Sequence, residues 1–295
     1  MISAPLIPYL ELPDIPLVPE GAFGRFPAEM ISIKPFGALV ATGIYLGAYL
    51  AVRQGKRLGL DERALVSLIF WAVGTAFVGA HVLDLVFYYP RKLLDDPLSL
   101  LRLWDGLSSF GGFCGAIAGA LLWKLRYKQR VVPYIEVIGS AFPTSWVFGR
   151  LGCSIAHDHP GSRSQLWFAV QYPSGGRFDL GLYEMLLTIP LALTFLVLRR
   201  KPRPWGFYTG VACVAYAPTR FALDFLRARD VHSADPRYGG FTPAQWACFG
   251  LLLFGAWLFW RGLSSANGQA APGPHPAPAV ASSANAQCTV GDASS

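Results

Sequence analysis

Arg150 is a candidate binding residue because it lies at the end of an apolar run that begins at Tyr134. A guanidinium placed in such a segment is costly, which makes it a functional candidate. Gly149, Gly152 and Gly161 lie around it in the sequence. Glycines let a backbone bend closely around a ligand, and a guanidinium pairs with negative charge. This stretch therefore predicts a site for an anion.

Three ionisable residues in the same stretch, His157, Asp158 and His159, could transfer a proton. An imidazole accepts a proton near neutral pH, and an adjacent carboxylate can orient it. The alternative is a hydrated interfacial loop that turns at Pro160 and Gly161. Two histidines two positions apart do not define a metal site, because no strong third ligand is evident. No metal is predicted.

The composition indicates a membrane protein. Of the 295 residues, 53% are hydrophobic and only 15% are charged, whereas a soluble domain carries about 25% charged residues. The apolar residues form blocks near the length that crosses a bilayer, about 20 residues. The net charge of +7 does not indicate nucleic-acid binding, because the basic residues lie between these blocks. Five cysteines show no metal-binding spacing.

The fold class predicted from these blocks is an all-α, polytopic integral membrane protein with seven transmembrane helices. A proline-rich arm, 1–33, is expected to lie on the membrane surface, and the helical domain covers 34–262. The tail, 263–295, is rich in Ala, Pro and Ser and is expected to be disordered. The predicted spans are 35–52, 64–89, 106–123, 133–151, 182–198, 205–225 and 241–260.

The basic residues predict the orientation, since they favour the cytoplasmic side. Dense basic clusters follow the first, third and fifth spans, whereas the other connections mix basic with acidic residues. The amino terminus is thus expected outside and the carboxyl terminus in the cytoplasm. The clusters are Arg53, Lys56, Arg57 and Arg63; Lys124, Arg126, Lys128 and Arg130; and Arg199, Arg200, Lys201 and Arg203.

In this orientation almost every polar group within the spans falls in the outer half of the membrane. The inner half is expected to be nearly pure hydrocarbon, which argues against a channel or an ion relay. A cavity open to the outer leaflet, which an anionic lipid head group could enter sideways, agrees with the pattern. The polar residues are His81, Asp84, Ser108, Ser109, Arg150, Tyr183, Glu184, Tyr216, Arg220, Asp224, Thr242 and Gln245.

Arg150 and Arg220 could clamp a phosphate there, because planar guanidinium groups match its oxygens and stay charged. The alternative is that each arginine only pairs with an acid, such as Asp224 or Glu184, to close the bundle. His81 and Asp84 lie three apart on one helix face. They either brace the second span or provide a base inside the cavity.

Two motifs resemble the prolipoprotein diacylglyceryl transferases of bacterial inner membranes. The family signature begins Gly-Arg-hydrophobic-Gly-(Asn or Cys) and ends at a glycine twelve positions later, as in 149–161. A second motif, Tyr-x-x-x-Arg-Phe-x-x-Glu-x-x-Arg-x-x-Asp, is similar to 216–230. Leu182-Tyr183-Glu184 matches the family's Leu-Tyr-Glu. The resemblance covers about residues 35–260.

The resemblance implies transfer of diacylglycerol from phosphatidylglycerol to the thiol of a lipobox cysteine in a prolipoprotein, with release of glycerol phosphate. It implies an enzyme at the periplasmic side of the inner membrane, with an arm 1–33 in the periplasm. Its partners would be these two substrates and membrane lipids, with neither a cofactor nor a nucleic acid. The implied lipid-binding residues are Arg150, Arg220, Gly149, Gly152, Gly161, Tyr216, Asp224, Tyr183 and Glu184.

The chain departs from the family where a base is expected. The family's third helix starts Ser-Phe-His-Gly-Gly, and here Phe110 stands in place of that histidine. A family arginine near the end of helix two corresponds to His81. The predicted base is therefore a histidine of the 157–159 segment, with Asp158, or His81. Alternatives are a non-catalytic lipid-binding protein on the same scaffold and, less favoured, a transporter.

Overall fold

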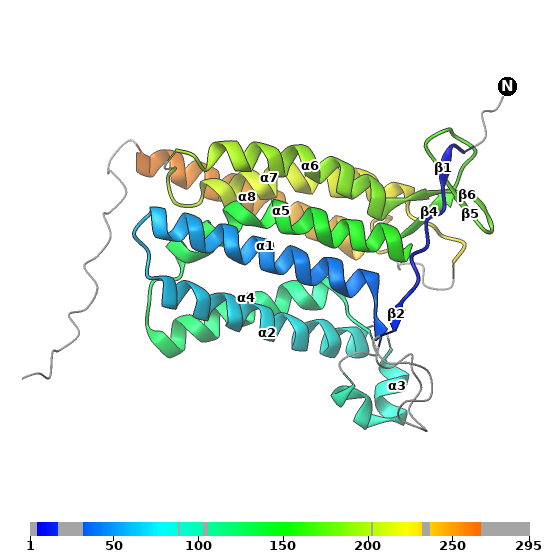
Figure 1. Ribbon diagram of the computed structural model, residues 1–295, viewed down its shortest axis with the longest axis horizontal. Helices are drawn as coiled ribbons and strands as arrows, with labels where there is room; N and C mark the ends of the chain where they lie inside the picture. Colours follow the sequence, from blue (N-terminus) through cyan, green and yellow to red (C-terminus); the bar gives the residue numbers. More distant parts are fainter. Residues whose placement is uncertain are drawn as a thin grey trace, which may run out of the picture.

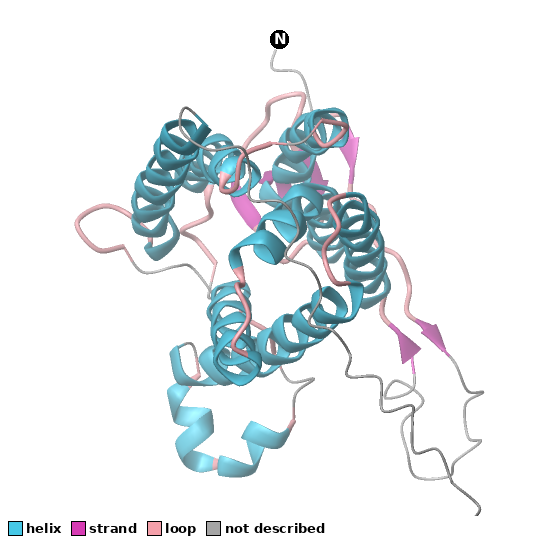
Figure 2. Ribbon diagram, turned by 90° about the vertical axis from the view of Figure 1, so that its left-hand side faces the viewer, coloured by secondary structure: helices cyan, strands magenta, loops and turns pink. Residues whose placement is uncertain are grey.

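The computed structural model describes residues 5–16, 32–87, 89–102, 106–201, 203–231 and 237–266. Seven helices of 17 to 26 residues make up most of this part of the chain and run back and forth along one axis (Figure 1). Figure 2 shows them end-on. They are α1 (Pro35–Arg57), α2 (Glu62–Phe87), α4 (Ser109–Tyr127), α5 (Val132–Ala156), α6 (Leu180–Leu198), α7 (Phe207–Leu223) and α8 (Pro243–Ala266).

The mainly helical membrane architecture is confirmed. Among the described residues, α1, α2, α6 and the segment Pro243–Gly262 of α8 are long and apolar enough to cross a membrane. That α4, α5 and α7 also cross, and which end of the bundle faces outward, stay predictions. Prolines within α5, α6 and α7 do not end these helices, in keeping with the tolerance of membrane helices for proline.

Helix ends are set by local chemistry. α1 starts with a proline, Pro35, whose missing N–H is not needed in the first turn. Ser108 accepts a hydrogen bond from the backbone N–H of Gly111 and caps α4. Asp179 caps α6 by accepting from the N–H of Leu182 at 2.9 Å. These caps fix where the site residues of α6 begin.

Glycines bring α2 and α4 into close contact. A Cβ added to Gly111 would come within 2.4 Å of the carbonyl oxygen of Gly79. A Cβ on Gly115 would meet the carbonyl oxygen of Thr75 at 2.2 Å. Gly119 packs equally tightly, whereas Gly112 has ordinary contacts. Small residues at such interfaces let the two backbones pack closely in a membrane.

The prediction of an all-α fold was incomplete, because two small sheets accompany the helices. The larger has the order β1-β5-β6-β4, with β1 (Ile7–Pro8), β4 (Pro160–Arg163), β5 (Val170–Tyr172) and β6 (Gly175–Asp179). Only β1 and β5 pair in parallel. This sheet lies at the end of the bundle where α5 ends and α6 begins (Figure 1). The smaller pairs β2 (Ile15–Pro16) with β3 (Ser32–Ile33).

Short helical turns complete the same end: α3 (Pro90–Asp95), η2 (Pro97–Leu101) and η3 (Asp224–Leu226). The predicted arm 1–33 is thus tied, where it is described, into both sheets by residues 5–16 and 32–33. Residues 17–31 of the arm, and 267–295 of the predicted disordered tail, lie outside the described residues. The domain boundaries stay predictions.

The expected, nearly pure hydrocarbon half of the bundle holds buried polar residues. At the end opposite the larger sheet, Gln54, Glu136 and Ser140 are buried among the helices. Glu136 accepts hydrogen bonds from the backbone N–H of Tyr208 at 2.5 Å and the hydroxyl of Thr209 at 2.9 Å. The carboxylate is tolerated because it satisfies the free N–H groups at the start of α7. Sequence position alone gave no sign of this pairing.

Candidate functional site

Arg150 is held by a carboxylate and two aromatic residues inside the bundle. Its Nε lies 2.9 Å from Oε1 of Glu184, which is only 1% exposed. The guanidinium sits over the ring of Trp146, 4.5 Å from its centroid. Glu184 also accepts from Trp146 Nε1 at 3.2 Å and from the Tyr216 hydroxyl. The last turns of α5, the first turn of α6 and the middle of α7 therefore meet on one carboxylate.

Arg220 has a separate acidic partner. Its Nη1 lies 3.0 Å from Oδ1 of Asp224, one turn later, but makes no hydrogen bond with acceptable geometry to any described residue. The hydroxyl of Thr242 donates to the other oxygen of Asp224, and Arg227 approaches the first at 3.4 Å. Asp224 is fully buried. Because Thr242 precedes α8, its hydrogen bond to Asp224 joins the end of α7 to the start of α8.

Tyr216 connects the two arginine networks. Its hydroxyl binds Glu184, the partner of Arg150, and it lies one turn before Arg220 on α7. It is within electrostatic range of both guanidinium groups. Tyr216 thus links the two arginine networks, and binding of one phosphate by both guanidinium groups stays a prediction. Arg150 pairs with Glu184 and Arg220 with Asp224, as in the alternative in which the arginines only close the bundle. Such pairing does not prevent an arginine from also binding an anion.

Asp158 and His159 form a dyad beside Arg150. Nδ1 of His159 is 2.5 Å from Oδ1 of Asp158, and its Nε2 makes no hydrogen bond to any described residue. The thiol of Cys153 lies close to these two side chains. Its sulfur, a carboxylate oxygen of Asp158 and a ring nitrogen of His159 all lie within 4.8 Å of one another. A neutral imidazole bound through Nδ1 has its Nε2 lone pair available to accept a proton.

Cys153 is the third potential metal ligand that the sequence analysis lacked. The Arg150 Nη1 lies 3.7 Å from its sulfur, however. A cation at the centre of Cys153, Asp158 and His159 would be repelled by that guanidinium. The arrangement better fits proton transfer than metal binding, and the prediction of no metal is kept.

His157 lies away from the dyad and has a different environment. Its Nδ1 is 2.8 Å from Oδ2 of Asp179, and its Nε2 is 3.1 Å from the carbonyl oxygen of Leu10. The ring stacks on Tyr9 with centroids 3.8 Å apart. Both ring nitrogens are thus engaged by oxygen atoms of the protein. His157 therefore joins the amino-terminal segment to α6 and offers no free lone pair for a base.

The environment of His81 favours bracing over catalysis. The side chain is fully buried, with Nδ1 3.1 Å from the carbonyl oxygen of Gly106 and Nε2 2.9 Å from that of Ser99. It fastens α2 to the connection that leads into α4. A Cβ added to Gly106 would lie 2.5 Å from Oδ2 of Asp84, so this carboxylate packs against the same connection.

The three glycines of the motif have different surroundings. A Cβ on Gly149 would meet nothing within 4 Å. A Cβ on Gly152 would meet the ring of Phe36 at 3.0 Å. One on Gly161 would lie 2.7 Å from Phe178, because β4 packs tightly between β6 and the segment after α7. Only Gly149 leaves room for a ligand.

Tyr183 is a support for the sheet end. Its hydroxyl donates to the carbonyl oxygen of Phe168 at 2.7 Å, and its ring lies against those of Phe168 and Phe178. This tyrosine positions the connection between β4 and β5, with no contact to either arginine.

The sequence analysis missed an ion pair between β6 and the segment that follows η3. Nη2 of Arg177 lies 2.6 Å from Oδ2 of Asp230, which Arg163 also approaches at 3.1 Å. Hydrogen bonds from Arg177, and then from Arg163, hold the pKa of Asp230 below its usual range. Asp230 is the last residue of the motif 216–230. Its place in that motif was the one feature of the sequence that could have identified it as a site residue.

A helical membrane protein with two buried arginine–carboxylate networks, one on Glu184 and one on Asp224, is the class that this fold and geometry define. A family model described as "Prolipoprotein diacylglyceryl transferase" matches residues 25–261. The chain belongs to the prolipoprotein diacylglyceryl transferase family.

Several relatives carry the name phosphatidylglycerol–prolipoprotein diacylglyceryl transferase. One from Nitratidesulfovibrio vulgaris is 27% identical over 85% of this chain and 99% of its own length. One from Chromohalobacter salexigens is 28% identical over 76% of this chain and 85% of its own. One from Actinobacillus pleuropneumoniae is 29% identical over 68% and 78%. The similarity therefore covers between 78% and 99% of the length of these three relatives.

Proposed function

We propose that the chain transfers the diacylglyceryl group of phosphatidylglycerol to a cysteine thiol of a prolipoprotein. The family and the names of the relatives support this reaction. The single observation that carries it is the convergence of Arg150 and Arg220, each fixed by its own carboxylate, on Tyr216. Fixed guanidinium groups bind a phosphate and stabilise charge that develops on it.

The chemistry requires a thiolate, an oriented glycerol carbon and a stabilised leaving group. The substrate sulfur forms a bond to the glycerol carbon as the bond from that carbon to the phosphate oxygen breaks. The electron pair of that bond leaves with glycerol phosphate, beside Arg150 and Arg220. The thiol proton passes to Nε2 of His159, which Asp158 orients through Nδ1.

The open space beside Gly149 gives the lipid a place next to Arg150. The contacts of His157 and His81 assign them structural roles, so His159 is the preferred base of the three histidines. Gly152, Gly161 and Tyr183 then act by shaping the walls of the site.

The proposed location is the outer leaflet of a bacterial inner membrane. All seven long helices span the membrane, the amino terminus is outside and the carboxyl terminus is cytoplasmic. The location of the basic clusters at the end of the bundle opposite Arg150 supports this orientation. The Arg150 site then faces the periplasm, where a lipobox cysteine becomes available.

A direct assay tests the function. Purified protein is mixed with labelled phosphatidylglycerol and a lipobox peptide, and the thioether product and glycerol phosphate are measured. Both products should form in equal amounts, and a peptide with serine in place of the cysteine should give neither. Lipid binding without product, even at high protein concentration, would contradict the proposal.

That last outcome defines the second candidate, a lipid-binding protein without transferase activity. One observation favours it: Phe110, at the position of the family histidine, is 54% exposed and contacts Phe87 at 6.4 Å between ring centroids. A phenyl ring transfers no proton. The dyad of Asp158 and His159 is the feature that makes transfer the better proposal.

A further inference from the structure

A second cluster of arginines lies at the end of the bundle opposite Arg150. Arg53 and Arg57 belong to the last turns of α1, and Arg199 and Arg203 to the connection between α6 and α7. Burial, then the charges of Arg57 and Arg53, lowers the pKa of Arg199. The like charges of Arg53 and Arg57 disfavour the Arg199 guanidinium, and an anion beside it would offset this effect.

Several donors in this cluster are buried and have no partner. Nη1 of Arg199, Nε of Arg203 and the hydroxyl of Tyr208 make no hydrogen bond to any described residue. The Tyr208 hydroxyl interacts with Arg203 without acceptable hydrogen-bond geometry, and Tyr208 is 5% exposed. A buried donor without an acceptor is costly, so these groups indicate an acceptor supplied from outside the chain.

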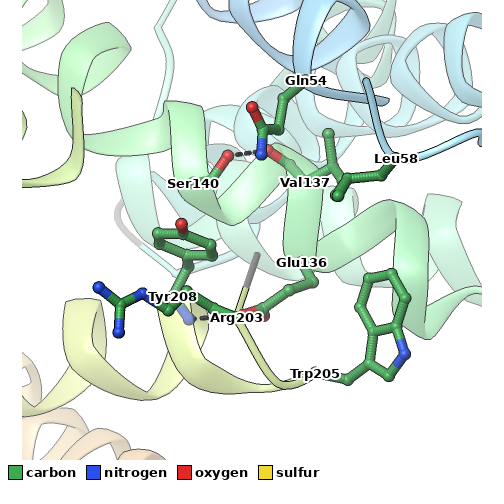
Figure 3. A pocket seen from close by; sticks show the side chains of 8 residues that line it. All are labelled: Gln54, Leu58, Glu136, Val137, Ser140, Arg203, Trp205 and Tyr208. Atoms are coloured by element: carbon green, nitrogen blue, oxygen red, sulfur yellow. Dashed lines mark hydrogen bonds between the residues drawn. The ribbon is translucent and has the colours of Figure 1, made fainter. Parts of the chain in front are cut away.

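The donors border a small cavity, lined by Gln54, Leu58, Glu136, Val137, Ser140, Arg203, Trp205 and Tyr208 (Figure 3). The Tyr208 hydroxyl points toward the side that Ser140 lines. The cavity volume of about 10 Å³ admits one oxygen-sized atom. The charge of Glu136 does not oppose an anion strongly, because its oxygens are bound to the start of α7.

An apolar groove precedes the arginines. Leu193, Thr194, Val197 and Leu198 line a shallow groove of about 340 Å³ on α6, directly before Arg199 in the chain. Leu193 and Val197 are each 58% exposed. A surface that places an aliphatic groove beside guanidinium nitrogens without hydrogen-bond acceptors matches a molecule with a negative head and a hydrocarbon chain.

We propose that this cluster binds an anionic phospholipid, with one phosphate oxygen in the cavity, between Arg203 and Tyr208, and an acyl chain on the groove of α6. Arg199 contacts the same phosphate from the α6 side. This lipid is distinct from the substrate lipid, because the two arginine sites lie at opposite ends of the helices. It holds the α6–α7 connection in place and takes no part in the transfer.

The test uses the full chain in detergent, with native mass spectrometry to count bound dioleoyl-phosphatidylglycerol. The double variant Arg199→Gln with Arg203→Gln should lose one tightly bound lipid, its affinity falling at least about tenfold. The charge-matched control, Lys124→Gln with Arg130→Gln, removes two exposed cations at the same end and should keep both lipids. Arg150→Ala should keep the lipid that the double variant loses.

Tyr208→Phe removes only the hydroxyl and should weaken the same lipid several-fold, which tests the site even if the double variant folds poorly. Dioleoyl-phosphatidylcholine should not replace the anionic lipid. Equal lipid counts in the double variant and the control would overturn the site. Displacement of the lipid by millimolar inorganic phosphate would overturn its assignment to a lipid, because the apolar groove would then contribute nothing.

Discussion

Arg150 and Glu184 form a buried ion pair, 2.9 Å between Nε and Oε1, that joins the end of α5 to the first turn of α6. The carboxylate also receives hydrogen bonds from Trp146 and Tyr216. The pair therefore sets the orientation of the guanidinium before any ligand arrives. A fixed donor needs little reorganisation during a reaction, which is where its catalytic value lies.

Arg150→Lys should retain the charge while losing the planar, two-pronged donor, and the transfer rate should fall about 100-fold or more. Arg150→Ala should abolish transfer. It should also lower the free energy of unfolding by about 3–5 kcal/mol, because Glu184 loses its cation. Thioether formation and thermal melting in detergent measure the two effects. Arg163→Lys, at an exposed pair, is the control and should change neither.

His159 and His157 should respond differently to substitution. His159→Ala should lower the rate of transfer about 100-fold with little change in affinity for phosphatidylglycerol, since general-base catalysis contributes about this much. His157→Ala should mainly reduce stability, because Asp179 and the Leu10 carbonyl lose a donor. The sequence alone had predicted the same kinetic effect for both. A rate unchanged by His159→Ala would remove the proposed base.

Gly149→Ala and Gly152→Ala separate ligand space from protein packing. A methyl group at 149 meets no protein atom, so the melting temperature should stay unchanged while the lipid affinity falls about tenfold. At 152 the methyl meets the ring of Phe36 at 3.0 Å, so stability should fall by about 1 kcal/mol or more. Melting curves and lipid titrations distinguish them. Full lipid affinity in Gly149→Ala would place the substrate elsewhere.

Acid should loosen the contact between Asp230 and Arg177. The pKa of Asp230 is lowered in the folded protein, so its stabilising effect is present above the ordinary carboxylate pKa of 3.8 and is lost as pH falls below it. Amide-exchange protection of Ala228, which donates to Pro160, should decrease between pH 6 and pH 3. Asp230→Asn should show low protection at both pH values. Equal protection of the wild type at both would contradict this.

Hydropathy predicted the seven long helices closely, because each has enough apolar residues to define it without its neighbours. The span 182–198 is observed as Leu180–Leu198, and 133–151 as Val132–Ala156. α5 continues past the predicted end at residue 151 to Ala156. The larger sheet escaped prediction. Its strands have two to five residues, and β1 pairs with a segment more than 150 residues later.

The candidate site was predicted in part. Residue types identified Arg150 and Arg220, because a guanidinium within an apolar segment is unusual. Residue types could not separate His157 from His159, since both occupy the same short stretch. Their difference depends on Asp179 and Leu10, which reach His157 only through the folded sheet end. The predicted span ended at residue 151, so it did not place Cys153 on α5. In the structure α5 runs to Ala156, and Cys153 lies close to Asp158 and His159.

The pairing of Ile7–Pro8 with β5, and the contact of His157 with the Leu10 carbonyl, has a practical consequence for anyone who handles this protein. Deleting the residues ahead of residue 12 would remove an edge strand, Ile7–Pro8, from the sheet that follows Asp158 and His159. Fusion partners therefore belong at the carboxyl terminus. If a shortened variant loses activity, the cause would be the loss of the contacts of residues 7–10 with β5 and His157, and not the loss of a functional group.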